Sequence, residues 1–284
     1  EYIMKVKVGV RGSKLALAYC NKALEQLGFT EANIVIVEST ADLNPTASIE
    51  EMGGKGVFCK EIEDCLKERS INIAVHAFKD VTRDNDAFLE IPCVIKRNDY
   101  RDCLIGNHID PKTIGTSSPR RIAQLKSLYP LSKIIPIRGN IDTRIKKQEN
   151  GEYDAIVLAV AGVDELGYMD KITRVFETNE MMPAPGQGVI AVQLVKPQTV
   201  REHNMSDLLR SKSHKDTWYC AMAERYMLER IDGDCQTPVG SISNINGRAL
   251  TIEAQNWETG KRGFVRGPKE NYKELGYELG SRLI

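Results

Sequence analysis

The sequence lacks an excess of charge of either sign and any long apolar run. Its 39 Lys and Arg residues balance 39 Asp and Glu residues over 284 positions. A protein that mainly binds nucleic acid or an anionic membrane needs a basic excess, so we expect neither partner. No apolar run approaches the ~18 residues that a membrane-spanning helix requires. The neutral balance does not exclude a cleft in which basic residues are gathered locally.

Metal-binding and nucleotide-binding signatures are also missing. The seven cysteines include no C-x-x-C pair, and the four histidines show no metal-ligand spacing. We therefore expect no metal centre and no disulfide framework. Unpaired cysteines are typical of a reducing compartment, which favours the cytoplasm. The motifs G-x-G-x-x-G and G-x-x-x-x-G-K-[ST] are absent, which makes a nucleotide a less favoured ligand.

The first two-thirds of the chain alternate strand and helix patterns. The apolar run over 71–78 predicts a buried strand, and apolar residues at helical spacing after Ser13 predict a helix that ends at Gly28. Such alternation predicts an α/β fold with mainly parallel sheets, in two similar blocks. The other predicted elements are strands over 4–10, 33–39, 133–137 and 153–160 and helices over 57–69, from Pro119 and over 141–149.

The last quarter of the chain has a different pattern. Ser213 and Asp216 have the spacing of a capping box, which predicts the start of a helix. Asn246-Gly247 lies between two alternating runs and is a strong hairpin signal, and a helical pattern returns at Lys269. We therefore expect a third, small α+β domain with an antiparallel sheet.

The segment His76-Ala77-Phe78-Lys79-Asp80 ends an apolar strand with a cation and a carboxylate. In open α/β sheets, ligands bind beyond the carboxyl ends of the strands. A carboxylate such as Asp80 can serve there as a general acid or base, or stabilise a cation. Lys79 and Asp80 are equally explained as the first solvated residues after a strand. The segment alone does not decide between these interpretations.

Arginine and hydroxyl side chains gather at several other strand-to-helix transitions. Backbone N–H groups at a helix start, hydroxyl donors and guanidinium groups together form an anion site. A single arginine of this kind is usually a surface charge, but its repetition predicts a cleft for a phosphate or a polycarboxylate. The residues concerned are Arg11 with Ser13, Gly115-Thr116-Ser117-Ser118-Pro119-Arg120-Arg121, and Arg138-Gly139-Asn140 with Arg144.

Two loop segments are weaker candidates. The glycine-rich loop 53–56 carries one cation, Lys55, and can cover a site, although glycine-rich turns are common. Cys235 follows a helix C-terminus and has acidic neighbours, which disfavours its thiolate. Cys235 is therefore not an activated nucleophile. It is either an inert buried cysteine or a covalent anchor that reacts once.

Taken in order, these segments resemble the hydroxymethylbilane synthase (porphobilinogen deaminase) family over nearly the whole chain. The resemblance implies two domains similar to periplasmic binding proteins, over 1–97 with 189–208 and over 98–188, and a third over 212–284 that carries the cofactor cysteine. It places the active site between the first two and implies a monomer. The matching segments are VGVRGSKLALA, GGKGVFCKEIE, IAVHAFKDV, GTSSPRRIAQL, IRGNIDTR, GEYDAIVLAVAG, PAPGQG and AERYMLERIDGDCQTPVGS.

The resemblance also implies an activity. A dipyrromethane cofactor is attached through a thioether, four porphobilinogen molecules are added head to tail with loss of ammonia, and hydrolysis releases hydroxymethylbilane. Asp80 is the implied catalytic residue. The implied cofactor-binding residues are Cys235, Lys79, Asp80, Thr116, Ser117, Ser118, Arg120, Arg121, Arg144 and Gly162, and the implied substrate-binding residues are Arg11, Ser13, Lys55, Arg138 and Arg144.

The chain also departs from the family pattern. The loop Ser39-Thr40-Ala41-Asp42 lacks an arginine that is common there, Glu51 stands where Lys is common, and Glu165 stands where Arg is common. These changes remove positive charge from the expected rim of the cleft. We expect intact chemistry but altered binding of late intermediates or altered loop closure. Further departures are Tyr19, Ala77, Thr82 and Asp234.

A non-catalytic anion-binding module with the same two-lobed fold is the rival interpretation. Composition and periodicity do not separate it from an enzyme. Asp80 and Cys235 together do, because a module that only binds an anion needs neither residue.

Overall fold

The structure is a computed structural model that describes residues 6–40, 58–82, 87–234 and 236–284. The chain divides into two compact units: unit 1 comprises Glu1–Arg97 and Val189–Trp218, and unit 2 comprises Asn98–Gly188 and Tyr219–Ile284. The predicted second and third domains both fall largely within unit 2, and the three domain boundaries stay predictions. Several residues singled out above lie outside the described residues, namely Ala41, Asp42, Glu51, the loop 53–56 with Lys55, and Cys235.

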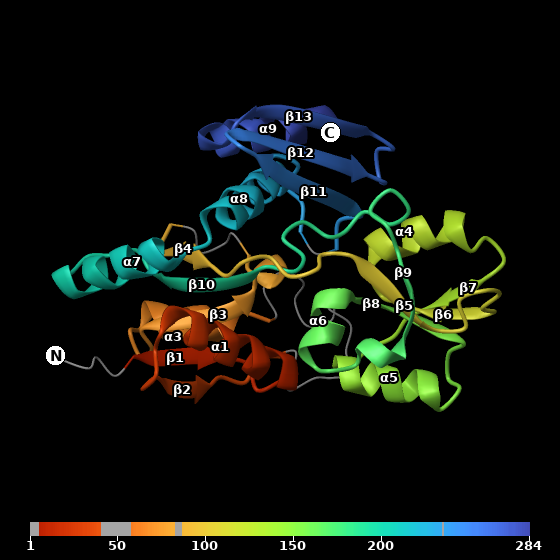
Figure 1. Cartoon of the computed structure of the whole chain (residues 1–284), viewed down its shortest axis with the longest axis horizontal. Helices are drawn as coiled ribbons and strands as arrows, with labels where there is room; N and C mark the ends of the chain where they lie inside the picture. Colours follow the sequence, from red (N-terminus) through yellow and green to blue (C-terminus); the bar gives the residue numbers. More distant parts are fainter. Residues whose placement is uncertain (1–5, 41–57, 83–86, 235) are drawn as a thin grey trace. The chain divides into compact units, whose positions relative to one another are not determined.

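Unit 1 is built on a five-stranded sheet with the order β2-β1-β3-β10-β4. Strands β1 (Lys7–Val10), β2 (Asn33–Ile36) and β3 (Ile73–Ala77) pair in parallel, whereas β10 (Ile190–Val195) runs antiparallel to β3 and to β4 (Leu89–Val94). Figure 1 shows β10 inserted beside β3, although it comes from a distant part of the chain.

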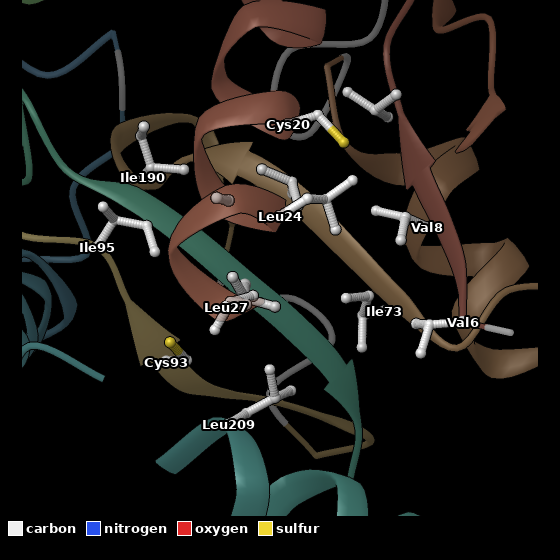
Figure 2. Packing of buried hydrophobic residues seen from close by; sticks show 14 of the residues in the cluster. Val6, Val8, Cys20, Leu24, Leu27, Ile73, Cys93, Ile95, Ile190 and Leu209 are labelled. Atoms are coloured by element: carbon white, nitrogen blue, oxygen red, sulfur yellow. The ribbon is translucent and has the colours of Figure 1, made fainter. Parts of the chain in front are cut away.

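Helices α1 (Lys14–Leu27) and α3 (Lys60–Lys67) cover opposite faces of this sheet. Side chains alternate along a strand, so Ile73 packs in the cluster with α1 and Ala74 packs in the cluster with α3. Figure 2 shows the α1 cluster, in which Leu24 points from the helix toward the sheet. The predicted buried strand is therefore apolar because both of its faces are covered.

The ends of α1 are formed by the residues that the sequence predicts. The Ser13 hydroxyl accepts a hydrogen bond from the Ala16 N–H at 3.2 Å and so caps the first turn. At the other end Gly28 adopts a left-handed conformation with φ of 71°, which ends the helix. Arg11 and Ser13 are thereby placed directly after β1, at the carboxyl end of a parallel strand.

Unit 2 contains a second five-stranded sheet with the order β7-β6-β8-β5-β9. Its strands are β5 (Asp102–Gly106), β6 (Thr113–Gly115), β7 (Lys133–Ile135), β8 (Ala155–Ala159) and β9 (Ile172–Val175). Strand β6 is parallel to β7 and β8, and β5 is antiparallel to β8 and β9. Helix α4 packs on one face, and α5 and α6 pack on the other; they span Pro119–Leu128, Ile141–Glu149 and Val160–Glu165.

The predicted α/β class is confirmed, but the two large sheets are mixed rather than mainly parallel. In each, one half of the pairings is parallel and the other half is antiparallel. The antiparallel half arises from β10 in unit 1 and from β5 in unit 2, each of which pairs against the direction of its neighbours. A strand that is buried on both faces is apolar whether it runs parallel or antiparallel to its neighbours, so its composition does not indicate its direction.

The small antiparallel sheet predicted near the C-terminus is confirmed. It contains β11 (Val239–Asn246), β12 (Ala249–Asn256) and β13 (Arg262–Pro268). Gly247 has φ of 62° in the predicted hairpin turn. One face of the sheet packs against α8 (Lys215–Arg230) and α9 (Tyr272–Leu283).

Helix α7 (Val200–Lys212) was not foreseen, whereas the helix predicted after Ser213 is present as α8. A capping box that was not predicted from the sequence is found at the start of α7. The box that forms joins Thr199 and Glu202. Ser213 ends α7, and its hydroxyl accepts from the Val94 N–H at 3.1 Å. Within the described part of the chain, no helix is long and apolar enough to cross a membrane.

Candidate functional site

In unit 1, the residues predicted at two strand ends share one edge of the sheet. Strands β1 and β3 are parallel, and Gly9 of β1 pairs with Ala74 of β3. Arg11, two residues after Gly9, therefore lies level with His76, and Asp80 follows in a short 3₁₀ turn, η1 (Phe78–Asp80). The parallel pairing thus brings the predicted cation and the predicted carboxylate to the same place.

A pocket opens at this edge and encloses about 420 Å³ of empty space, part of it open to solvent. Its polar lining includes Arg11, Ser13 and Asp80, and its apolar lining includes Tyr19 and Phe58. The Arg11 guanidinium carbon lies 4.7 Å from the centre of the Phe58 ring, within range of a cation–π contact. Such a pocket suits a flat apolar group that carries a carboxylate and develops positive charge.

The backbone around Asp80 is held at several points. The Phe78 N–H donates to the Val189 carbonyl at 2.9 Å, and the Val81 N–H donates to the Phe78 carbonyl at 3.1 Å. The Cys59 thiol donates to the Asp80 carbonyl at 3.1 Å. Asp80 is half-buried beside the pocket, whereas Lys79 is exposed and does not line it.

Two pocket residues, Cys59 and His76, received no role from the sequence. Burial lowers the pKa of His76 to about 4; its hydrogen bond with Gln193 acts in the opposite direction, and the charge of Arg11 lowers it further. His76 is therefore neutral near pH 7. A histidine within an apolar strand indicates that a buried partner exists, but Gln193 is too distant in sequence for the pattern to identify it.

In unit 2, the hydroxyl groups of the predicted anion segment build the turn before α4. Ser118 caps the helix by accepting from the Arg121 N–H at 3.4 Å, which leaves its own O–H available as a donor. The Thr116 hydroxyl likewise accepts, from the Ser118 N–H at 3.2 Å. The Ser117 O–H instead donates to the Ile137 carbonyl at 2.9 Å, so Ser117 holds the segment against the chain that follows β7.

Arg120 and Arg121 of this segment are buried, and both form ion pairs with the same carboxylate. A guanidinium nitrogen of Arg120 and one of Arg121 each lie 2.7 Å from an oxygen of Asp102, which has no exposed surface. Burial alone would raise the pKa of Asp102, but the two guanidinium charges outweigh it and hold that pKa well below its usual range. Gln187 also donates to Asp102, at 3.0 Å. Asp102 thus fixes the direction of both arginines.

Arg138 and Arg144 lie at the next strand-to-helix transition. Gly139 has φ of 112°, and its carbonyl accepts from Arg144 Nε at 2.7 Å. Burial, followed by the charges of Arg121 and Arg138, lowers the pKa of Arg144 to about 10. The guanidinium groups of Arg121 and Arg138 are therefore close enough to disfavour the charge of Arg144, and a bound polyanion would relieve that repulsion.

The remaining predicted cofactor residues lie around β8 and after α8. Gly162 is buried in the first turn of α6, directly after β8. Cys235 itself lies outside the described residues, but its flanks form a turn. The Gln236 N–H donates to the Asp234 carboxylate at 2.8 Å, and the Asp234 N–H donates to the Thr237 hydroxyl at 2.9 Å. Asp234, where the family commonly has glycine, thus caps this turn with its side chain.

Asp102 is the residue that sequence reasoning missed. It begins the otherwise apolar strand β5, and a carboxylate in a buried strand needs a cationic partner. That rule could have identified Asp102 from the sequence. Its partners, however, are Arg120 and Arg121, which were interpreted only as residues that bind the anion of a ligand. A cation that binds an internal carboxylate and one that binds a ligand have the same appearance in sequence.

Two family profiles match the chain. "Porphobilinogen deaminase, dipyromethane cofactor binding domain" matches residues 6–202, and "Porphobilinogen deaminase, C-terminal domain" matches residues 218–284. A porphobilinogen deaminase from Alkaliphilus oremlandii is 35% identical over 296 residues, covering 99% of this chain and 97% of that protein. One from Corynebacterium efficiens is 36% identical over 297 residues, with coverages of 99% and 97%.

Among solved structures, the second substrate-binding domain of a putative amino acid ABC transporter from Streptococcus pneumoniae matches with a TM-score of 0.44 and 12% identity. The match covers 73% of this chain and 91% of that one. A likeness at that level carries no argument about function.

Proposed function

The chain belongs to the porphobilinogen deaminase family of transferases, and from that premise we propose how its residues carry out the reaction. The reaction is the head-to-tail condensation of four porphobilinogen molecules on a dipyrromethane cofactor, with loss of one ammonia each, and hydrolytic release of hydroxymethylbilane. The pocket that joins Asp80, Arg11 and Ser13 is the observation on which the proposal rests.

In the proposed substrate site, Arg11 and the Ser13 hydroxyl bind a side-chain carboxylate of porphobilinogen, a pyrrole that carries an acetate, a propionate and an aminomethyl group. Asp80 hydrogen-bonds the pyrrole N–H and the departing amine. Asp80 first transfers a proton to the amine; the carbon–nitrogen bond then breaks, its electron pair leaves with the nitrogen as ammonia, and positive charge develops on the pyrrole. The Asp80 carboxylate stabilises that charge where it forms, and the apolar wall around it strengthens the interaction.

The residues proposed to bind the cofactor are those that the family resemblance implies, Lys79 and Asp80 among them. The clustered guanidinium groups fit a ligand with several carboxylates, because each bound carboxylate relieves repulsion among the cations. The dipyrromethane supplies an unsubstituted pyrrole carbon as the nucleophile. The proposed contacts of unit 2 are Thr116, Ser118, Arg120, Arg121, Arg144 and Gly162, with Ser117 holding the segment and Arg138 binding substrate carboxylates.

Cys235 is proposed as the thioether anchor, and Lys55 as a cation that approaches bound substrate. The support for Cys235 is its chemistry: an anchor reacts once and has no need of a stabilised thiolate. The residues that flank it are hydrogen-bonded to one another, Gln236 to the Asp234 carboxylate and Asp234 to the Thr237 hydroxyl.

We also propose that the protein is a cytoplasmic monomer that binds no nucleic acid or membrane. The balance of 39 basic and 39 acidic residues supports the lack of a polyanionic partner. Light scattering coupled to size-exclusion chromatography tests the monomer; a mass of two chains would contradict it.

The intact mass of the purified protein tests the proposed function. We expect a covalent excess equal to two pyrrole units, absent from Cys235→Ser and retained in the matched control Cys65→Ser. We also expect release of hydroxymethylbilane from porphobilinogen. A chain that stays unmodified after incubation with porphobilinogen would favour the non-catalytic anion-binding module instead.

A further inference from the structure

A series of buried contacts extends from the lining of the unit 1 pocket into the protein, on the face of the sheet that α3 covers. Glu63 of α3 accepts from Gln193 Nε2 at 3.0 Å, and Gln193 Oε1 lies 3.0 Å from His76 Nε2. The other ring nitrogen, His76 Nδ1, lies 3.6 Å from the Cys59 sulfur. The Cys59 thiol in turn lies 3.1 Å from the Asp80 carbonyl oxygen. The series therefore joins α3 to the turn that carries Asp80.

The hydrogen bond between Gln193 and Glu63 determines which group donates and which accepts in the contacts that follow. Gln193 donates through its amide nitrogen to Glu63, so its amide oxygen faces His76. His76 must then carry its proton on Nε2. Because burial keeps this ring neutral near pH 7, Nδ1 has no proton and is an acceptor. The side of the ring that faces Cys59 is thereby fixed as an acceptor.

The Cys59 thiol consequently stands between two acceptors, His76 Nδ1 and the Asp80 carbonyl, with one proton to donate. The shorter distance is to the carbonyl. His76 lies on the other side of the sulfur, so both the Asp80 carbonyl and the ring are acceptors within reach of the thiol. Cys59 is 1% exposed and lines the pocket, so water does not replace this contact readily.

This contact matters because the turn that carries Asp80 is short. Element η1 has three residues and one internal bond, from the Val81 N–H to the Phe78 carbonyl. The direction of a side chain at its last residue depends on how that peptide is held. A small displacement of a catalytic carboxylate can cost a large part of the rate.

We propose that Cys59 and His76 are positioning residues for the reaction: the thiol holds the Asp80 peptide, and the ring holds the thiol. This proposal rests on the proposed function, because it assigns to Asp80 the catalytic role. It gives a role in the site to two residues that had none. It also predicts that position 59 requires a hydrogen-bond donor, and that a side chain of equal volume without a donor does not suffice.

Four variants test the proposal. Cys59→Ser keeps a donor at this position, Cys59→Ala removes it, and Cys59→Val removes it while filling the space. Cys65→Ser is the matched control, since Cys65 lies on α3, the helix that begins directly after Cys59, and does not line the pocket. For each, we would measure the cofactor-bearing fraction by intact mass, the unfolding midpoint, and kcat and KM for porphobilinogen separately.

We expect Cys59→Ala and Cys59→Val to lower kcat about 10-fold with KM changed less than about twofold, on chains that carry the cofactor fully. Cys59→Ser should stay within about threefold of the unaltered protein, and Cys65→Ser should equal it. Should Cys59→Ala not fold, Cys59→Val provides the comparison; should neither fold, His76→Gln, which withdraws the ring from the thiol, should lower kcat in the same way.

Two results would overturn the positioning role. One is an apolar variant with unaltered kcat, and the other is a Cys59→Ser variant as impaired as Cys59→Ala at equal stability. Neither result would touch the proposed function, since the unaltered protein would still turn over porphobilinogen. An unaltered protein that carries no cofactor and is inactive would overturn the proposed function itself.

Discussion

The carboxylate of Asp102 accepts from Arg121 at 2.7 Å, and neither side chain has more than 8% of its surface exposed. Arg120 binds the other oxygen of the same carboxylate at the same distance. A buried carboxylate of the protein itself therefore orients the two arginines of the predicted anion-binding segment 115–121. These arginines are already oriented before any ligand binds, which lowers the entropy that binding must overcome.

Removing the Asp102 charge should therefore destabilise the protein. We expect Asp102→Asn to lower the free energy of unfolding by about 3 kcal/mol, because two buried guanidinium groups lose their counterion. Asp99→Asn is the matched control: Asp99 pairs with Arg101, and both side chains are about one-third exposed, so we expect less than about 1 kcal/mol. Urea unfolding measures both values, and equal effects would contradict the buried-network argument.

Stability should depend on pH through His76. Its folded pKa is about 4 against an ordinary value of 6.5, so the unfolded chain binds more protons between these values and stability falls as pH falls through that window. The expected loss between pH 7 and pH 5 is about 2 kcal/mol. Amide exchange of β3 and β10 measures it.

His76→Gln should flatten this dependence, because the variant has no group there to protonate. His203→Gln, at an exposed position of α7, should keep it. A dependence that persists in His76→Gln would assign the titration to another group.

Asp80→Asn should separate catalysis from cofactor binding. The amide keeps the size of the side chain but cannot stabilise positive charge or transfer the proton, so we expect kcat to fall at least about 100-fold. The covalent excess in the intact mass should remain. Asp64→Asn, at a solvent-facing ion pair with Lys67, should have unaltered kinetics. Retained turnover in Asp80→Asn would remove Asp80 from its assigned role.

Arg144→Gln should weaken the binding of carboxylate-bearing ligands. Losing a partly buried cation from the cluster should raise KM or lower the cofactor-bearing fraction about 10-fold. The difference from the unaltered protein should shrink at high salt, where the remaining charges are screened. Arg174→Gln is the control, because Arg174 pairs with Glu180. A salt-independent effect would indicate a structural role instead.

The departures from the family pattern at Glu51 and Glu165 should affect late intermediates. Glu165 is half-buried at the end of α6, and Glu51 lies outside the described residues. We expect Glu51→Lys with Glu165→Arg to shift the distribution of enzyme-bound intermediates, resolved by intact mass, while turnover begins normally. An unchanged distribution with unchanged turnover would show that these positions do not influence chain growth.

Features that depend on neighbouring residues were predicted well from the sequence. The bounds of α5, Ile141–Glu149, agree with the prediction, and so do the Ser13 cap, the Gly28 end and the hairpin at Gly247. Each is decided by backbone conformation and hydrogen bonds within a few residues. The positions of Asp80 and of the strand-end arginines were predicted for a similar reason, because a strand end can be recognised locally; their roles stay predictions.

Features that depend on distant segments were not predicted. Strand β10 joins β3 across more than a hundred residues, and its antiparallel direction follows from where the chain returns to unit 1. The bond between His76 and Gln193 spans 117 positions. The spacing of apolar residues does not identify such pairs. It indicates that a residue is buried, but not which distant residue it contacts.

The amino-acid sequence alone determined where many of the helices and strands lie, which side chains follow the predicted strands, and which family the chain resembles, since local geometry and motif order are properties of the chain. Only the tertiary structure decided that Arg120 and Arg121 are held by Asp102, and that Cys59 contacts the Asp80 peptide. Those pairings exist because packing excludes water from them, and packing is a property of the folded whole.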